Sequence, residues 1–461
     1  MLWVCKRARS AVESETMRKL LLFLAICSLP WLILPSAAME RQPNGDYRAR
    51  REALARKMGN GVAVVFAGTD VEASATGFRQ TDNFYYLTGW SEPGAAVLVA
   101  PAREASPGRP YTEILLLPPR DLVEERWTGV KLGPDSPEAV AKTGFDRVLA
   151  LGALDEELPR LLMKEDKVYV ELTGSEALPT PTSTGLMEWL KRSRAIPGRI
   201  PTVDVRPIMA SLRTVKDAGE LALMKKAAEA SMAAHLAVMK ALKPGMSERE
   251  VAAILNYEAE KRGCERPSYA PIVGSGFNGT VLHYSEDDGP INAGDLVVID
   301  AAGEYSMYAD DITRTLPASG KFTPRQREIY DIVLGAQQAA IAAFQSGKST
   351  MGRKAENSLD LVARDYIKTH GKDLHGASLD QYFIHGLGHY VGLFVHDDND
   401  YTVPLGPGAV FTIEPGIYIP EEKFGVRIED MFYVDAEGKL VKMTAALPST
   451  ADEVEKAMRG K

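Results

Sequence analysis

The chain has 461 residues, of which 45% are hydrophobic and 25% charged, and its formal net charge is -8. This length is too great for one ordinary hydrophobic core, so we expect a soluble globular protein with two domains. The acidic balance argues against a nucleic-acid-binding protein, because such a protein usually presents a basic face.

The N-terminal segment of residues 17–38 has the composition of a secretory signal peptide. Two basic residues precede an apolar stretch at residues 20–34, and small residues at 36–38 provide a cleavage site. The apolar stretch is shorter than the about 20 residues of a membrane-spanning helix, and Pro30 interrupts it. We therefore expect residues 1–38 to comprise an upstream extension and a cleaved signal peptide, which predicts an exported (periplasmic or secreted) protein. An uncleaved membrane anchor is the alternative.

Residues 40–205 alternate short apolar stretches with helical ones, which is typical of an α/β domain. The aromatic-rich residues 78–90 are expected to pack in a core or at a subunit contact. We see no catalytic constellation in this domain, for which substrate gating or oligomerisation is the expected role. The predicted elements are a charged helix at residues 46–58 and strands at residues 62–66, 95–99, 114–117 and 167–170.

A segment rich in Pro and Gly at residues 197–207 is predicted to link this domain to a second one. The second domain opens with a long helix that begins near Asp217. His235 lies on the apolar face of that helix, where a packed histidine is more common than a metal ligand. A second helix follows, with Ser247 as its N-cap and Glu250 at the capping-box position.

Two hairpins in the second domain each carry a pair of acidic residues. One hydrophobic strand ends in Asp300, and the strand after it contains Asp311. The same design returns downstream, where a hydrophobic strand ends in Glu414 and the next turn leads to Glu429. Helical sequence precedes each hairpin, so we expect an internal α/β repeat whose pseudo-two-fold axis brings the four carboxylates together.

Between these hairpins, three of the seven histidines fall within residues 385–397, at His385, His389 and His396. Glycines among them let the backbone approach its neighbours, and we expect a strand-like segment from which His389 joins the four carboxylates. Such a set of donors favours two divalent cations, most of all Mn²⁺, with Zn²⁺, Co²⁺ or Fe²⁺ as alternatives. Two cations about 3.5–4 Å apart can polarise a carbonyl group and activate a water molecule. The alternative is that the acids are solvated strand ends and that the histidines lie in a polar loop.

These segments resemble the motifs of a known family. Residues 206–461 are similar to the pita-bread metallopeptidases, and in particular to the proline-directed branch of Xaa-Pro aminopeptidases and prolidases. Parts of residues 78–93 resemble the N-terminal domain of that branch. The resemblance implies an α/β (α+β) fold, in which a creatinase/prolidase-like α/β domain precedes a pita-bread catalytic domain with an internal pseudo-two-fold repeat. It rests on residues 385–397 and on the segments around Asp300, Asp311, Glu414 and Glu429.

The resemblance also implies a reaction and a role for each site residue. A hydroxide that bridges the two cations would attack the carbonyl of the first residue, with Glu414 as the proton shuttle. His283 and His396 would hydrogen-bond the substrate and the tetrahedral oxyanion, and His385 would line the prolyl pocket. The implied metal ligands are Asp300 for one cation, His389 and Glu414 for the other, and Asp311 and Glu429 for both.

Two further residues lie next to the implied ligands. Arg427 is two residues from Glu429 on a predicted strand, so their side chains share a face and Arg427 is expected to hold Glu429. Asp310 departs from the resemblance, because the position before Asp311 is usually a small residue in that family. Adjacent strand residues point to opposite faces, so Asp310 is expected to point away from the cations.

The favoured function is an exported, two-metal Xaa-Pro aminopeptidase that acts on proline-containing peptides and forms a homo-oligomer, either a dimer or a tetramer. A prolidase restricted to Xaa-Pro dipeptides is the closest alternative. It would need a side chain that binds the C-terminal carboxylate of the substrate, and the sequence does not locate one. A catalytically silent binding protein on the same scaffold is disfavoured, because all five ligand positions hold residues that can bind a cation.

Overall fold

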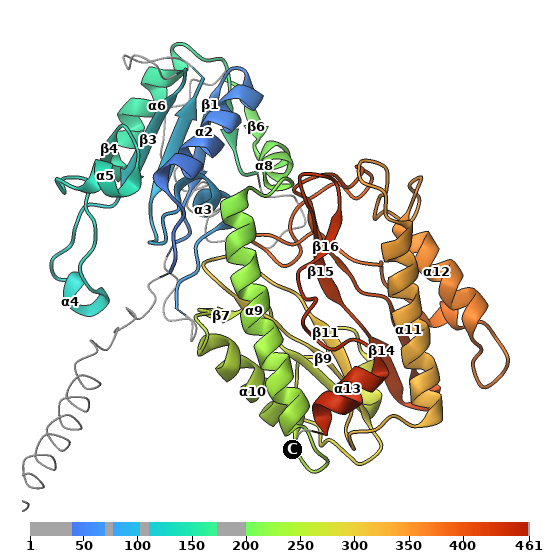
Figure 1. The fold of residues 1–461 in the computed structure, drawn as a ribbon. Helices are drawn as coiled ribbons and strands as arrows, with labels where there is room; N and C mark the ends of the chain where they lie inside the picture. The colour runs from blue at the N-terminus through green and yellow to red at the C-terminus, as the bar shows by residue number, and fades with distance from the viewer. Residues whose placement is uncertain (1–38, 70–76, 102–109, 173–199, 460–461) are drawn as a thin grey trace, which may run out of the picture. The chain divides into compact units, whose positions relative to one another are not determined.

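The computed structural model describes residues 39–69, 77–101, 110–172 and 200–459 (Figure 1). The predicted extension and signal peptide at residues 1–38 lie outside the described residues. Residues 41–461 form one compact unit. Within the described ranges, the structure contains no helix with the length and apolar character needed to cross a membrane.

The N-terminal part of the chain builds one six-stranded mixed sheet in the order β4-β3-β2-β1-β5-β6. Strand β1 pairs with β2 in the antiparallel sense and with β5 in the parallel sense. The sheet's inner strands are apolar at nearly every position because side chains on both of their faces are buried. Its elements are α2 (Asn44–Met58), β1 (Val62–Phe66), α3 (Asp82–Thr88), β2 (Ala96–Ala100), β3 (Thr112–Leu117), α4 (Glu125–Thr128), α5 (Ala139–Thr143), β4 (Val148–Ala150), η1 (Leu151–Ala153), α6 (Leu154–Leu162), β5 (Val168–Val170) and β6 (Thr202–Asp204).

The prediction of a linker at residues 197–207 is wrong for residues 200–207, which are the part that the structure describes. Residues after Pro201 form the edge strand β6, and helix α8 (Arg206–Arg213) begins almost at once. Both prolines occupy positions that tolerate them: Pro201 precedes an edge strand, and Pro207 lies in the first turn of a helix. The carbonyl of Pro201 accepts a hydrogen bond from Val168 N at 2.9 Å, so this segment belongs to the sheet.

The aromatic-rich segment forms part of the hydrophobic core rather than an exposed contact surface. It contains helix α3, whose Phe84, Tyr85, Tyr86 and Leu87 side chains are buried. This is the first of the two outcomes that the sequence predicts for the segment.

The C-terminal part of the chain repeats one plan twice, which is two helices followed by antiparallel strands. The first half has the sheet order β11-β9-β8, and the second half has β12-β15-β16. In Figure 1 the helices α9, α11 and α13 lie in front of the strands β9, β11 and β14. The elements are α9 (Ala218–Ala241), α10 (Glu248–Glu260), β7 (Arg266–Pro267), β8 (Ile272–Ser275), η2 (Gly276–Thr280), β9 (Leu296–Asp300), β10 (Gly303–Glu304), β11 (Thr313–Pro317), α11 (Pro324–Ala343), α12 (Leu359–His370), η3 (Leu379–Tyr382), β12 (Val410–Ile413), β13 (Gly416–Ile419), η4 (Pro420–Glu422), β14 (Phe424–Arg427), β15 (Asp430–Val434), β16 (Leu440–Lys442) and α13 (Ala451–Met458).

The predicted capping box at Ser247 is confirmed, and α9 begins with a second one at Asp217, where the sequence predicted only the start of a helix. Asp217 caps α9 and Ser247 caps α10, and each forms a full capping box with the glutamate three residues later. His235 is buried on α9, with its Nε2 atom 2.9 Å from the carbonyl oxygen of Ala301. It is therefore a packed histidine, as predicted.

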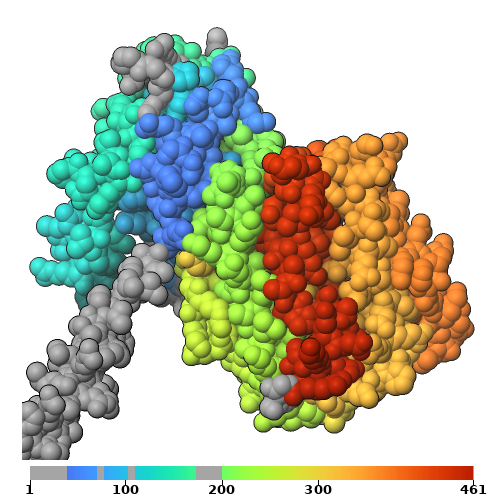
Figure 2. Space-filling model, in the orientation of Figure 1, coloured from blue at the N-terminus to red at the C-terminus, as the bar shows by residue number. Residues whose placement is uncertain are grey.

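Both halves share one hydrophobic core, which runs from Ala234 on α9 to Met458 on α13. In the space-filling view of Figure 2, the green α9 and the orange α11 border the red C-terminal segment on either side. The predicted α/β architecture with an internal repeat is confirmed.

Candidate metal centre and active site

The acidic residues lie where the paired strands of the two halves end. Asp300 is the last residue of β9 and pairs with Thr313, the first residue of β11. Glu414 directly follows β12, and Glu429 directly precedes β15, its antiparallel partner. A backbone bridge between Thr313 and Glu429 joins the two halves, so the ends of both hairpins meet.

The histidine-rich segment is an irregular chain rather than the predicted strand, although it runs along β12. The amide of Thr412 donates to His389 O at 2.8 Å, and the amide of Glu414 donates to Leu387 O at 2.8 Å. Gly388 makes this approach possible, because a Cβ atom there would lie 2.2 Å from Thr412 O. These contacts place His389 beside Glu414.

Helix α12 holds the start of the same segment. Asp360 accepts hydrogen bonds from Leu387 N at 2.9 Å and from Arg364 Nε at 2.7 Å. The guanidinium of Arg364 in turn donates to the carbonyls of Phe383 and His385. Asp360 is fully buried, so the pair fixes the backbone on which the site histidines stand.

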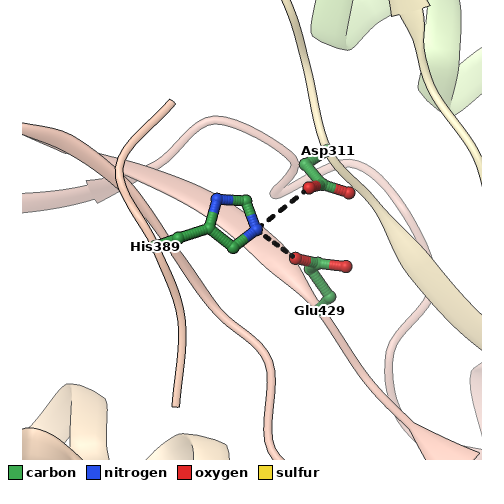
Figure 3. Close-up of side chains that lie close together, drawn as sticks. All are labelled: Asp311, His389 and Glu429. Atoms are coloured by element: carbon green, nitrogen blue, oxygen red, sulfur yellow. Dashed lines mark ion pairs between the residues drawn. The ribbon is translucent and has the colours of Figure 1, made fainter. Parts of the chain in front are cut away.

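The His389 imidazole points into a group of carboxylates. Its Nε2 atom lies 3.2 Å from Asp311 Oδ2, 3.3 Å from Glu414 Oε1 and 4.0 Å from Glu429 Oε1. Figure 3 shows Asp311 and Glu429 converging on this nitrogen, and one donor atom from each of the three residues lies within 4.8 Å of the others. This spacing suits a shared cation.

The electrostatics of Glu429 test whether a cation fits. Its Oε1 atom is buried without a hydrogen-bond partner, while Oε2 accepts a bond from Thr313 Oγ1 at 2.7 Å. Burial raises the pKa of Glu429 well above its ordinary value, and the charges of Asp311 and Glu414 raise it further. A buried carboxylate without a counter-charge is unfavourable, so the residues present fit a divalent cation.

The pKa values of His389 and Glu414 also respond to this excess of negative charge. Burial alone would lower the pKa of His389, but the hydrogen bond with Asp311 and the charge of Glu414 raise it to about 9. Burial raises the pKa of Glu414 to about 7, against the charge of His389. The imidazole therefore carries a proton at the place where a cation would bind.

Asp300 has a different environment, and here the prediction for Arg427 is wrong. Arg427 does not contact Glu429 directly; its Nη2 atom donates to Asp300 Oδ2 at 2.6 Å. Its Nε atom donates to Thr313 Oγ1 at 3.1 Å, and Thr313 in turn donates to Glu429. Sequence spacing places Arg427 and Glu429 on one face, but it does not reveal that Asp300 from the other half lies closer.

Two tyrosines complete the site, and sequence reasoning gave neither a role. The Tyr269 hydroxyl lies 2.5 Å from Asp300 Oδ1 and 2.6 Å from Asp311 Oδ1. The Tyr418 hydroxyl lies 2.8 Å from both His385 Nε2 and Arg427 Nη1. Tyr418 falls in the motif that begins at Glu414, whereas no local pattern marks Tyr269.

The predicted site residues line a cavity of about 540 Å³. His283 and His396 are exposed to solvent at this cavity, so a ligand can reach both. The His396 and His389 rings meet edge to face with centroids 4.2 Å apart. The predicted site residues that line the cavity are Asp300, Asp311, His283, His385, His389, His396, Glu414, Arg427 and Glu429.

Asp310 does not line the cavity. Its side chain is fully buried, and both carboxylate oxygens lack a hydrogen-bond partner of normal geometry. Burial raises the pKa of Asp310 to about 8. The residue is therefore a buried acid beside the site rather than a ligand in it.

Comparisons with known proteins agree with this geometry. Residues 222–436 match the model of metallopeptidase family M24, and residues 47–169 match the aminopeptidase P N-terminal domain. The chain is 35% identical to the Xaa-Pro aminopeptidase of Escherichia coli strain K12 over 436 residues, which covers 90% of this chain and 97% of that protein.

Solved structures give the same result. The aminopeptidase PepP of Pseudomonas aeruginosa has a TM-score of 0.78 and 34% identity, with coverage of 91% of this chain and 99% of that one. Zinc-substituted aminopeptidase P of E. coli in complex with product has a TM-score of 0.77 and 32% identity, with the same coverage. The chain therefore belongs to metallopeptidase family M24, carries an aminopeptidase P N-terminal domain, and is a metal-dependent N-terminal exopeptidase.

Proposed function

We propose that this chain is a two-metal Xaa-Pro aminopeptidase that releases the first residue of peptides with proline in the second position. The observation that carries the proposal is the convergence of four carboxylates and one imidazole in one open cavity. The similarity to an Xaa-Pro aminopeptidase over 90% of the chain supports the choice of substrate.

The five donors would hold two divalent cations, and Mn²⁺ suits a set that is rich in carboxylates. When bound, such cations polarise a carbonyl group and activate water. The ligands would be Asp300, Asp311, His389, Glu414 and Glu429.

The chain's own residues would orient the peptide and move the proton. Glu414 lies beside His389 in the cavity and would carry the proton to the leaving nitrogen. The exposed His283 and His396 would donate hydrogen bonds to the substrate and to the developing oxyanion. His385, held by Tyr418, would line the pocket for the proline ring.

The substrate class has a physical basis. The amide before proline has no N–H group, and the ring fixes φ of that residue. A peptidase that recognises the amide proton therefore cannot bind this bond in its usual way. A site that instead uses cations, histidines and a pocket for the ring does not need that proton.

The cavity favours an aminopeptidase over the prolidase alternative. A dipeptidase needs a positively charged side chain that binds the C-terminal carboxylate of its substrate. Among the described residues that line the cavity, Arg427 is the only lysine or arginine. Its guanidinium is already bonded to Asp300, Thr313 and Tyr418, so it is not placed to bind a substrate carboxylate.

Hydrolysis of a dipeptide Xaa-Pro and a tetrapeptide Xaa-Pro-Yaa-Zaa tests the proposal. The Mn²⁺-loaded chain should release the first residue of the tetrapeptide, and EDTA should abolish this release. Cleavage of the dipeptide alone would establish a prolidase instead. If Glu414→Gln left all activity unchanged, a binding protein without catalysis of its own would be the better account.

We also propose that the chain forms a homo-oligomer, a dimer or a tetramer. The segment around α4 exposes four large apolar side chains, which is unusual for a free surface. Their exposed fractions are 67% for Leu122, 67% for Val123, 87% for Trp127 and 81% for Val130. Sedimentation of the wild type and of Trp127→Ser tests this, since the variant should shift toward the monomer.

Export remains a proposal that rests on residues 17–38 alone. Full-length protein expressed in a bacterial host should be recovered outside the cytoplasm, and its N-terminal sequence should begin just after residue 38. An intact N-terminus in the membrane fraction would favour the anchored alternative.

A further inference from the structure

The loop of residues 392–397 brings His396 to the cavity and is closed by its own backbone. The amide of Asp397 donates to Tyr390 O at 2.9 Å, and the amide of Gly392 donates to Phe394 O at 3.1 Å. Asp397, the neighbour of His396, is 2% exposed and points away from solvent. The position of Asp397 therefore restricts where the backbone of His396 can lie.

Two positively charged side chains from the segment that leads into α9 bind the Asp397 carboxylate. Arg213, the last residue of α8, donates to Asp397 Oδ1, and Lys216 Nζ donates to Oδ2 at 3.1 Å. The exposed fractions of these side chains are 5% for Arg213, 1% for Lys216 and 1% for Asp397. Charge-assisted hydrogen bonds in such a buried place are strong and directional.

A second arginine reaches the same loop from the N-terminal part of the chain. Arg79 donates to the carbonyl of Leu393, three residues before His396. Its Nε atom also donates to Glu304 Oε2 at 2.6 Å. The loop is thus held at Leu393 as well as at Asp397.

Asp82, at the start of α3, joins the two arginines. Its Oδ1 atom lies 2.8 Å from Arg79 Nη1, and its Oδ2 atom lies 3.4 Å from Arg213 Nη2. Arg213 also donates to Asn83 Oδ1 at 2.8 Å. The result is a closed ring of contacts from Asp82 through Arg79 to Leu393, and from Asp82 through Arg213 to Asp397.

Each carboxylate of this ring and its neighbours faces at least one positively charged side chain. Arg79, Arg213 and Lys216 contact Asp82, Glu304 and Asp397, and Arg266 Nε also lies 3.4 Å from Glu304 Oε1. The network therefore needs no bound ion, in contrast to the metal centre. The network contacts both α3 and the loop of His396, and it therefore holds that loop in place.

We propose that Arg79, Asp82 and Arg213 are positioning residues that hold His396 at the cavity through the loop of residues 392–397. This rests on the proposed function, in which His396 hydrogen-bonds the substrate. The N-terminal domain then contributes to catalysis itself, beyond gating or oligomerisation. A displacement of about 1 Å at a reacting group can cost about 100-fold in rate, so loss of the ring should be visible in kcat.

The test is a double-mutant cycle between Asp82→Asn and His396→Ala in the full chain. Asp82→Asn keeps the side-chain shape at a partly exposed position, so the chain should fold. In the wild-type background it should lower kcat for the tetrapeptide by about tenfold, with KM changed by less than about twofold. In the His396→Ala background the same substitution should change kcat by less than about twofold, because Asp82 acts through the imidazole.

The control is Asp204→Asn, which weakens the Asp204–Arg206 pair (2.7 Å) at the end of β6, away from the loop. It should leave kcat unchanged. Equal losses from Asp82→Asn with and without His396, or no loss at all, would overturn the proposal.

Hydrogen exchange provides a readout that does not depend on activity. Asp82→Asn should speed exchange in the peptide that covers residues 391–397 relative to Asp204→Asn. Unchanged exchange there would overturn the proposal too. If the wild type cleaves no prolyl peptide, the proposed function fails, and the exchange result alone decides whether the ring holds the loop.

Discussion

Buried acids occur both in the N-terminal sheet and in the metal centre, but the protein treats them differently. Glu113 on β3 accepts hydrogen bonds from Arg51 Nε at 2.6 Å and from the Tyr111 hydroxyl at 2.9 Å. The Arg51 and Glu113 side chains are both fully buried. Glu429 is buried to the same degree, yet one of its oxygens has no partner and its nearest charged neighbours include other acids.

The difference separates a structural acid from a ligand. In the N-terminal sheet, the charge of Glu113 is matched by that of Arg51, so the pair is complete as it stands. In the metal centre, four carboxylates share one arginine and one imidazole, which leaves an excess of negative charge. A cation from outside the chain is needed to complete the set.

Removal of the metal should have the largest effect. EDTA treatment should lower kcat for the tetrapeptide by about 1000-fold, because the cations supply several kcal/mol of transition-state stabilisation. Added Mn²⁺ should restore the rate. The variant Glu113→Gln should keep its response to Mn²⁺, and a wild-type enzyme that stays active without metal would remove the distinction between the two regions.

Breaking the matched pair should destabilise the N-terminal sheet. Arg51→Met removes the buried counter-charge of Glu113 and leaves only the partly exposed Arg48, whose Nε lies 4.0 Å from Glu113 Oε1, so the free energy of unfolding should fall by about 3–4 kcal/mol. Urea denaturation measures this loss. The double variant Arg51→Met/Glu113→Gln should recover part of it, and a loss below about 1 kcal/mol would show that the pair is not matched as described.

The stability of the metal-free chain should depend on pH in the opposite sense to that of the metal-loaded chain. The pKa of His389 is raised to about 9, so its stabilising effect is complete below pH 6.5 and is lost as the pH rises toward 9. The raised pKa values of Glu414 and Asp310, about 7 and about 8, act in the same direction. Metal-free protein should lose about 3 kcal/mol or more from pH 6.5 to 9.

Saturating Mn²⁺ should reverse this slope, because binding requires a neutral imidazole and charged carboxylates. Thermal unfolding at a series of pH values measures both slopes. Asp310→Ala separates the contribution of Asp310 from that of the metal centre. Metal-free stability that increases from pH 6.5 to 9 would contradict the assigned environment of His389.

Neutralising one acid of the metal centre should give the smallest effect, and it should have the opposite sign to that of Arg51→Met. Glu429→Gln in the metal-free chain removes an unmatched charge and keeps an acceptor for Thr313, so it should raise the free energy of unfolding by about 1 kcal/mol. With Mn²⁺ present the variant should be less stable than the wild type. Destabilisation of the metal-free variant would mean that Glu429 has a counter-charge after all.

Local patterns in the sequence predict those parts of the site that lie within one half of the second domain. A hydrophobic strand that ends in an acid, seen twice, predicts Asp300 and Glu414 at strand ends. The glycines between His385 and His396 predict close packing of that segment, and Gly388 against Thr412 is the contact responsible. The helix starts at Asp217 and Ser247 follow from capping boxes within four residues.

Contacts between distant parts of the chain were beyond the reach of such patterns. Arg427 bonds to Asp300, 127 residues away, although its spacing from Glu429 favoured a contact on its own strand. Arg213 reaches Asp397 across 184 residues, and nothing in the segment around either residue marks the other. The strand at residues 202–204 was hidden by the prolines that flank it, Pro201 and Pro207, because only the assembled sheet shows that it lies at an edge.

The central claim is that the excess of carboxylates in the second domain is a centre for two cations. Anomalous diffraction at the manganese edge from crystals of the full chain grown with Mn²⁺ tests this most directly. Two anomalous peaks should appear among Asp300, Asp311, His389, Glu414 and Glu429, and at least one of them should be lost in Glu429→Gln. An active enzyme whose crystals show no peak among these five residues would contradict it.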